Sequence, residues 1–92
     1  MMVSLSEHAR FQLAKLERFK VHEDTVHATL EDPDLTLIDT ATGNLIAINY
    51  EAKIAVAYAK RVDAPRVVTV IYSSKIEDPV RRRRRSHRWN KF

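Results

Sequence analysis

The feature that most constrains this 92-residue chain is a change of hydrophobic period at Pro33. Before this proline, apolar residues recur every three or four positions, which is the spacing of an amphipathic helix. After it, apolar and β-branched residues alternate or run together in short segments, which is typical of strands. Pro33 also blocks helix continuation and biases Asp32 away from helical backbone. The sequence therefore predicts an α+β chain with helices before Pro33 and strands after it.

Two helices are expected before Pro33. The first spans Leu5 to Phe19 and begins at Ser4 or Ser6, both of which are good N-cap residues. The second spans Glu23 to Leu30 or Glu31, and its two acidic opening residues suit the positive end of the helix dipole. Because only a short junction separates the two helices, we expect an antiparallel hairpin or an L.

Four strands are expected after Pro33, at residues 35–39, 45–50, 54–60 and 66–72. The third is rich in alanine, so its period alone does not exclude a helix. Short connections between consecutive strands favour antiparallel pairing. The helices must then cover one face of the sheet, which gives a single two-layer α+β domain at residues 1–79. The predicted fold is two N-terminal helices packed on a four-stranded antiparallel sheet, in the order ααββββ, followed by a basic C-terminal tail.

Charge is unevenly divided along the chain. The formal net charge is +4, yet residues 81–92 hold seven cations and no acid, so the rest of the chain is mildly acidic. Five of these cations are adjacent arginines, which repel one another. We therefore expect residues 80–92 to form a separate, flexible, Arg-rich tail.

This tail is the strongest candidate for nucleic-acid binding. Each guanidinium can bind a phosphate through two hydrogen bonds, and a tryptophan can stack on an unpaired base. There are two alternatives to nucleic-acid binding: the tail binds an acidic protein partner, or it has no partner and only aids solubility. Phosphate contacts carry no base information, so no sequence preference is expected. The candidate nucleic-acid-binding residues are Arg81, Arg82, Arg83, Arg84, Arg85, Arg88 and Trp89.

Composition argues against several other classes. The chain has no Cys and a single Gly, which excludes disulfides, zinc fingers and Gly-rich phosphate loops. His22 and His27 miss the four-residue spacing that places two metal ligands on one helix face. We therefore expect no metal and no cofactor. No apolar run is long enough for a membrane span, and the first residues do not resemble a signal peptide, so we expect a cytoplasmic protein with no membrane contact.

One end of the predicted sheet is a candidate for chemistry. Arg61 closes the third strand and Arg66 opens the fourth, so these cations are expected to lie close together. Cations that hold a phosphate, with a proton donor and acceptor nearby, are sufficient for metal-independent RNA cleavage. The alternative is a solvated strand end balanced by Asp63. His8, in the first turn of the first helix, is either a packing or capping residue or a general acid or base.

Several local motifs together resemble a known family. They are Ser-x-His-Ala at Ser6 to Ala9, the helix hairpin, the helix exit Leu30-Glu31-Asp32-Pro33, and the strand Val67-Val68-Thr69-Val70. Over roughly residues 5–73 the chain resembles small domains grouped with the RelE/ParE toxin superfamily, with BrnT-like toxins as the nearest branch. The resemblance implies an mRNA-cutting toxin that uses basic residues and sometimes a tyrosine, silenced by an antitoxin partner. It also implies that His8 matches the family's histidine in the first helix.

The resulting hypothesis is a toxin-like RNA-binding protein, with metal-independent endoribonuclease activity as its enzymatic form. The resemblance makes Arg61, Arg66 and Tyr72 approximate counterparts of the residues that carry chemistry, so the candidate catalytic residues are His8, Arg61, Arg66 and Tyr72. One alternative is a non-catalytic nucleic-acid-binding module that acts through its Arg-rich tail. The other is a protein-interaction domain, such as a homodimer formed through the alanine face of the third strand (Ala55, Ala57 and Ala59).

Overall fold

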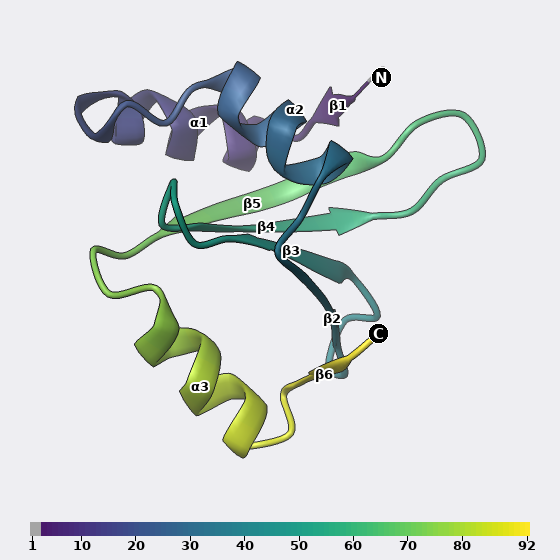
Figure 1. The fold of residues 1–92 in the computed structure, drawn as a ribbon. Helices are drawn as coiled ribbons and strands as arrows, with labels where there is room; N and C mark the ends of the chain where they lie inside the picture. Colours follow the sequence, from purple (N-terminus) through teal and green to yellow (C-terminus); the bar gives the residue numbers. More distant parts are fainter. Residues whose placement is uncertain (1–2) are drawn as a thin grey trace.

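The computed structural model describes residues 3–92 and contains one central sheet with helices on both faces (Figure 1). The helical elements are α1 (Glu7–Leu16), the 3-10 helix η1 (Glu17–Phe19), α2 (Glu23–Glu31) and α3 (Glu77–Arg85). The strands are β1 (Ser4–Leu5), β2 (Leu35–Asp39), β3 (Leu45–Asn49), β4 (Ile54–Ala59), β5 (Arg66–Tyr72) and β6 (Trp89–Lys91). Their order in the sheet is β1-β5-β4-β3-β2-β6, and only the β1–β5 pair is parallel. Among the helices described, none combines the length and apolar character needed to span a bilayer.

The fold predicted from the sequence is wrong in its layers and in its sheet. The sheet is mixed and six-stranded rather than four-stranded and antiparallel, and a third helix covers its second face. Residues 80–92, which we expected to be a flexible tail, form most of α3 and all of β6, so the expected boundary after residue 79 falls inside a helix. The four predicted strands and the second helix are present, whereas the first helix ends at Leu16 and continues as η1.

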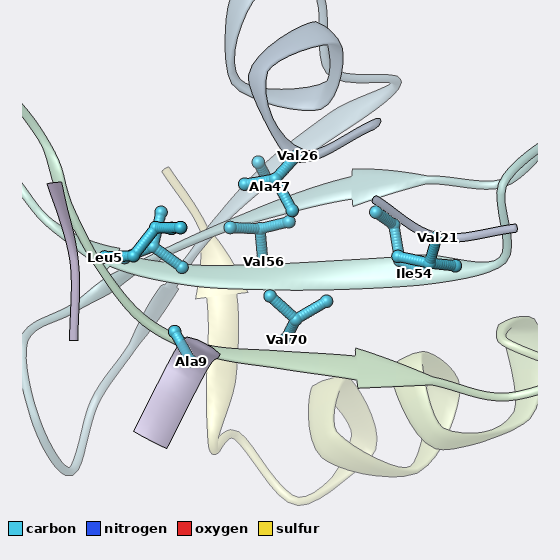
Figure 2. Packing of buried hydrophobic residues seen from close by; sticks show 9 residues of the cluster. Leu5, Ala9, Val21, Val26, Ala47, Ile54, Val56 and Val70 are labelled. Atoms are coloured by element: carbon cyan, nitrogen blue, oxygen red, sulfur yellow. The ribbon is translucent and has the colours of Figure 1, made fainter. Parts of the chain in front are cut away.

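Helices α1 and α2 cover one face of the sheet (Figure 1), and Figure 2 shows buried residues of this side, among them Ala9 of α1 and Val26 of α2. Ser6 begins α1: its Oγ accepts a hydrogen bond from the Ala9 N–H at 3.0 Å and donates to the Val68 carbonyl at 2.9 Å. The same side chain therefore caps the helix and ties its start to β5. The buried core on this face consists of Leu5, Ala9, Val21, Val26, Ala47, Ile54, Val56, Val67 and Val70.

Helix α3 and the Trp89 side chain, from the edge strand β6, cover the opposite face. Ile76, Val80 and Trp89 are 1%, 4% and 3% exposed. They pack in one cluster with residues of strands β2, β3 and β4, namely Leu37, Ile46, Ile48, Ala55 and Ala57. Ala55 and Ala57, which the homodimer alternative placed at a contact with a second copy, are thus covered by the chain itself. Burial on both faces explains why β3 and β4 are apolar at nearly every position.

Replacing Trp89 by alanine is expected to lower the free energy of unfolding by about 3–5 kcal/mol, because the change removes a large buried side chain and leaves a cavity. Urea unfolding followed by circular dichroism measures this difference. The control is Val62→Ala, at a fully exposed position, which should change the free energy by less than about 0.5 kcal/mol. Identical unfolding midpoints for Trp89→Ala and the unmodified protein would contradict a core role for the C-terminal segment.

Candidate nucleic-acid interface

The four residues predicted to carry catalysis are spread over the structure. Arg66 begins β5 and Tyr72 ends it, which places them about 20 Å apart along the strand. The Arg66 Nη1 donates to Ser4 Oγ at 3.1 Å. The Tyr72 ring stacks on Phe19, with a centroid distance of 4.2 Å and an interplanar angle of 13°.

His8 and Arg61 occupy two further places. His8 Nε2 lies 3.1 Å from Thr69 Oγ1, near the middle of β5. Arg61 lies in the loop between β4 and β5, at a pocket of about 410 Å³ that Tyr58 and Phe92 also line. That pocket contains none of the other three residues. The arrangement therefore does not bring the four predicted residues together around one phosphate.

The arginine run forms a helix because its charges suit the helix ends. Glu77 and Asp78 lie in the first turn of α3, and arginines fill its last turn, which complements the helix dipole. Arg81 Nη1 also donates to Asp78 Oδ1 at 3.3 Å. Both of these side chains are well exposed, so the pair itself stabilises the helix little. Burial of Val80 against the sheet fixes which side of α3 faces inward.

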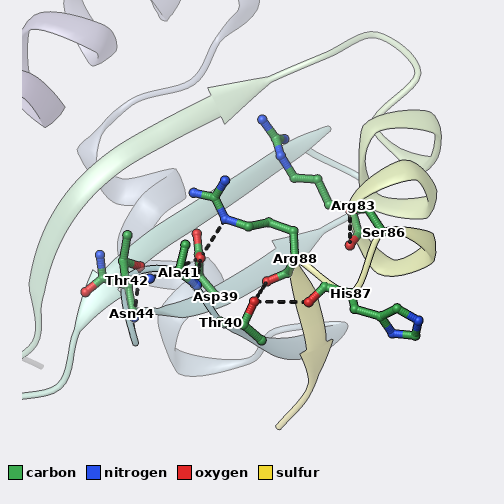
Figure 3. A network of polar contacts seen from close by, with 9 residues as sticks. All are labelled: Asp39, Thr40, Ala41, Thr42, Asn44, Arg83, Ser86, His87 and Arg88. Atoms are coloured by element: carbon green, nitrogen blue, oxygen red, sulfur yellow. Dashed lines mark hydrogen bonds and ion pairs between the residues drawn. The ribbon is translucent and has the colours of Figure 1, made fainter.

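Besides Arg81, three more of the residues predicted to bind nucleic acid have structural contacts. Trp89 is buried rather than exposed, which leaves little ring surface for a base. The Arg83 guanidinium lies over its ring, 4.8 Å from the centroid. Arg88 Nε donates to Asp39 Oδ1 at 2.8 Å (Figure 3). The Arg88–Asp39 contact attaches the C-terminal segment to the end of β2, where the turn into β3 begins.

Thr40 strengthens the same attachment from the β2–β3 turn (Figure 3). Its backbone N–H donates to the Arg88 carbonyl at 2.8 Å. Its Oγ1 lies within hydrogen-bonding distance of two carbonyls, those of His87 at 3.0 Å and Arg88 at 3.1 Å. The turn into β6 is therefore held by both backbone and side-chain groups.

Asp39 is the acidic centre of this network. Burial alone would raise the pKa of its carboxyl group, but hydrogen bonds from Arg88 and from the backbone N–H groups of Ala41 and Thr42 outweigh that effect. The pKa of Asp39 is therefore lowered from its ordinary value of 3.8. The same contact raises the pKa of the Arg88 guanidinium above its ordinary value.

Three arginines of α3 line a pocket against the sheet, whereas Arg82 is exposed and lies outside it. Arg81, Arg84 and Arg85 lie around it with Tyr50, at the end of β3, and its volume is about 640 Å³. Within residues 3–92, neither Arg84 nor Arg85 forms an ion pair. Guanidinium groups in such a setting can bind phosphate oxygens through paired hydrogen bonds. We call Arg81, Arg84, Arg85 and Tyr50 the α3 interface.

The sequence predicted that the arginines of this interface bind nucleic acid, but it predicted neither their arrangement on a helix nor the part of Tyr50 in the pocket. The available signal was spacing: positions 81, 84 and 85 lie on one side of a helix, because residues three and four apart are neighbours there. That spacing has meaning only in a helix, whereas the repulsion between adjacent arginines predicts a flexible segment. Tyr50 carries no local motif, and its part in the pocket depends on how α3 packs.

Comparisons with known proteins add no further constraint. No family model, curated protein or solved structure matches the chain. The resemblance to RelE/ParE toxins therefore stays a prediction, and the interpretation of the α3 interface rests on its own geometry.

Asp39→Asn is expected to lower the free energy of unfolding by about 1.5–3 kcal/mol near neutral pH, because it removes a charge-assisted hydrogen bond from a buried carboxylate. Folding lowers the pKa of Asp39, so its stabilising contribution is complete above the ordinary value of 3.8. That contribution is lost as the pH falls through the lower pKa of the folded protein. Urea unfolding at several pH values should therefore show the two proteins converging in acid.

The matched control is Asp63→Asn, which changes an exposed carboxylate in the β4–β5 loop. It should leave the stability and its pH dependence nearly unchanged. A difference between Asp39→Asn and the unmodified protein that stayed constant from neutral pH into strong acid would contradict the assigned ion pair.

Proposed function

We propose that this protein binds nucleic acid through the α3 interface. The observation that supports the proposal is the placement of three guanidinium groups around one pocket, two of them without an acidic partner in the described chain. An ordered helix presents these groups with part of their conformational entropy already lost, which favours binding over a flexible tail. Backbone phosphates are the chemical group that such a surface fits.

We propose binding rather than cleavage. Metal-independent cleavage needs a proton donor and a proton acceptor within reach of the same phosphate. His8, Arg66 and Tyr72 are instead distributed along the length of β5, and Arg61 lies in a separate loop pocket. The toxin hypothesis remains a prediction from resemblance, and the binding proposal does not depend on it.

The double substitution Arg84→Gln and Arg85→Gln tests the interface. We expect the affinity for a labelled single strand of about 16 nucleotides to fall roughly tenfold or more at low salt. Each lost phosphate contact removes about 0.7 from the slope of log affinity against log salt, so the slope should become shallower by about 1.4. Fluorescence anisotropy over a range of salt concentrations measures both quantities.

A matched double variant, Arg10→Gln with Lys15→Gln, makes the same change of net charge on α1, across the sheet from α3. It should retain most of the affinity. If both double variants lose affinity equally, net charge rather than the α3 interface drives binding. If poly-glutamate competes as well as the nucleic acid, the partner is an acidic protein and the proposal is wrong.

A further inference from the structure

A second basic pocket lies on the α1–α2 side of the sheet. Lys20, Lys53, Phe19 and Tyr72 line it, together with residues of the β3–β4 turn, and its volume is about 380 Å³. Lys20 follows η1 and Lys53 closes the turn into β4. Both lysines have a backbone φ of 62°, in the left-handed region that asparagine or glycine adopts with less strain.

The two basic pockets share one short segment of chain. Asn49 and Glu51 line the second pocket, whereas Tyr50, between them, lines the α3 pocket. Tyr72, which lines the second pocket, packs against the core beneath α1 and α2, whereas Tyr50 packs against the core beneath α3. The pockets therefore lie back to back across the end of β3. Figure 1 shows the α1–α2 connection, the β3–β4 turn and the start of α3 at the same end of the sheet.

Cations outnumber acids in both pockets. The second pocket has two lysines and one acid, Glu51. The α3 pocket has three arginines and one acid, Glu77. A polyanion that leaves one pocket across the β3–β4 turn thus meets a second cationic site rather than a repulsive surface.

The second pocket also offers aromatic surface. Phe19 stacks on Tyr72, and the Arg18 guanidinium lies over the Phe19 ring, 4.7 Å from its centroid. Aromatic rings and guanidinium planes both stack on unpaired bases, whatever their identity. A base pair inside a duplex cannot use such a surface, because its faces are already stacked on its neighbours.

We infer that the ligand is a single strand of nucleic acid, which crosses the β3–β4 turn and places successive phosphates in the α3 pocket and at Lys20 and Lys53. This inference rests on the proposed nucleic-acid binding and specifies its substrate class. A duplex is stiff over about 150 base pairs, so it cannot bend from one face of a sheet to the other around a single turn. A single strand bends freely and brings unpaired bases to the aromatic stack.

The double substitution Lys20→Asn and Lys53→Asn tests this path. Asparagine removes both charges and tolerates the left-handed backbone, so the fold is preserved. We expect the affinity for the single strand to fall roughly tenfold at low salt and its salt slope to become shallower by about 1.4. The affinity for a duplex of the same length should stay within about twofold, because the duplex reaches only the α3 interface.

The control is Lys15→Gln with Lys60→Gln, which removes the same charge on the outer side of α1 and after β4, outside both pockets. It should leave single-strand affinity within about twofold. If Lys20→Asn with Lys53→Asn behaves like this control while Arg84→Gln with Arg85→Gln weakens binding, the second site is wrong and the proposed function stands. If the unmodified protein binds neither form of nucleic acid, both proposals are wrong.

Photo-crosslinking on the unmodified protein gives an independent measurement of the path. A strand that carries 4-thiouridine should crosslink to peptides from two regions, residues 77–85 and residues around Phe19 or Tyr72. Crosslinks confined to residues 77–85 would overturn the inferred path without contradicting the α3 interface.

Discussion

The structure depends on one constraint: both faces of the central sheet are apolar and both must be covered. Val56 of β4 packs in the core beneath α1 and α2, and its neighbour Ala55 packs in the core beneath α3. The N-terminal helices supply only one cover. The chain that follows β5 supplies the other through Ile76, Val80 and Trp89. Hydrophobic burial therefore makes the Arg-rich segment part of the fold.

Because this segment is part of the core, two of its arginines make contacts within the protein and two others stay exposed. Once Val80 and Trp89 point inward, Arg83 lies over the Trp89 ring and Arg88 pairs with Asp39. Arg84 and Arg85 remain exposed beside the sheet and belong to the proposed binding surface. Deletion of residues 80–92 would therefore remove binding groups and uncover the sheet at once, which makes point substitutions the clearer test.

The sequence predicted the helices and strands whose own residues show a clear hydrophobic or charge pattern. The alternation and β-branching of residues 66–72 predicted β5 correctly, and the acidic opening of residues 23–31 predicted α2. Strands β1 and β6 are too short to carry a signal, since their pairing is decided by the strands beside them. Repulsion between adjacent arginines predicts a flexible segment instead of α3. The burial of Val80 against the sheet favours the helix, and this burial cannot be read from the arginine run itself. The continuous apolar runs of β3 and β4 indicate strands that are buried on both faces of the sheet, so the fold needs a second covering layer.

The turn between β3 and β4 separates the two basic pockets, so a ligand that contacts both of them must bend around it. The Asn49 Nδ2 donates to Thr29 Oγ1 of α2 at 3.0 Å, and its Oδ1 accepts from the Ala52 N–H at 2.9 Å. The Tyr50 N–H donates to Asp34 Oδ2 at 2.8 Å. These hydrogen bonds hold the turn between the two pockets from α2 and from the residue before β2. In the proposed complex the ligand itself must bend around this turn, so we expect the protein to discriminate polyanions by their flexibility rather than by their sequence.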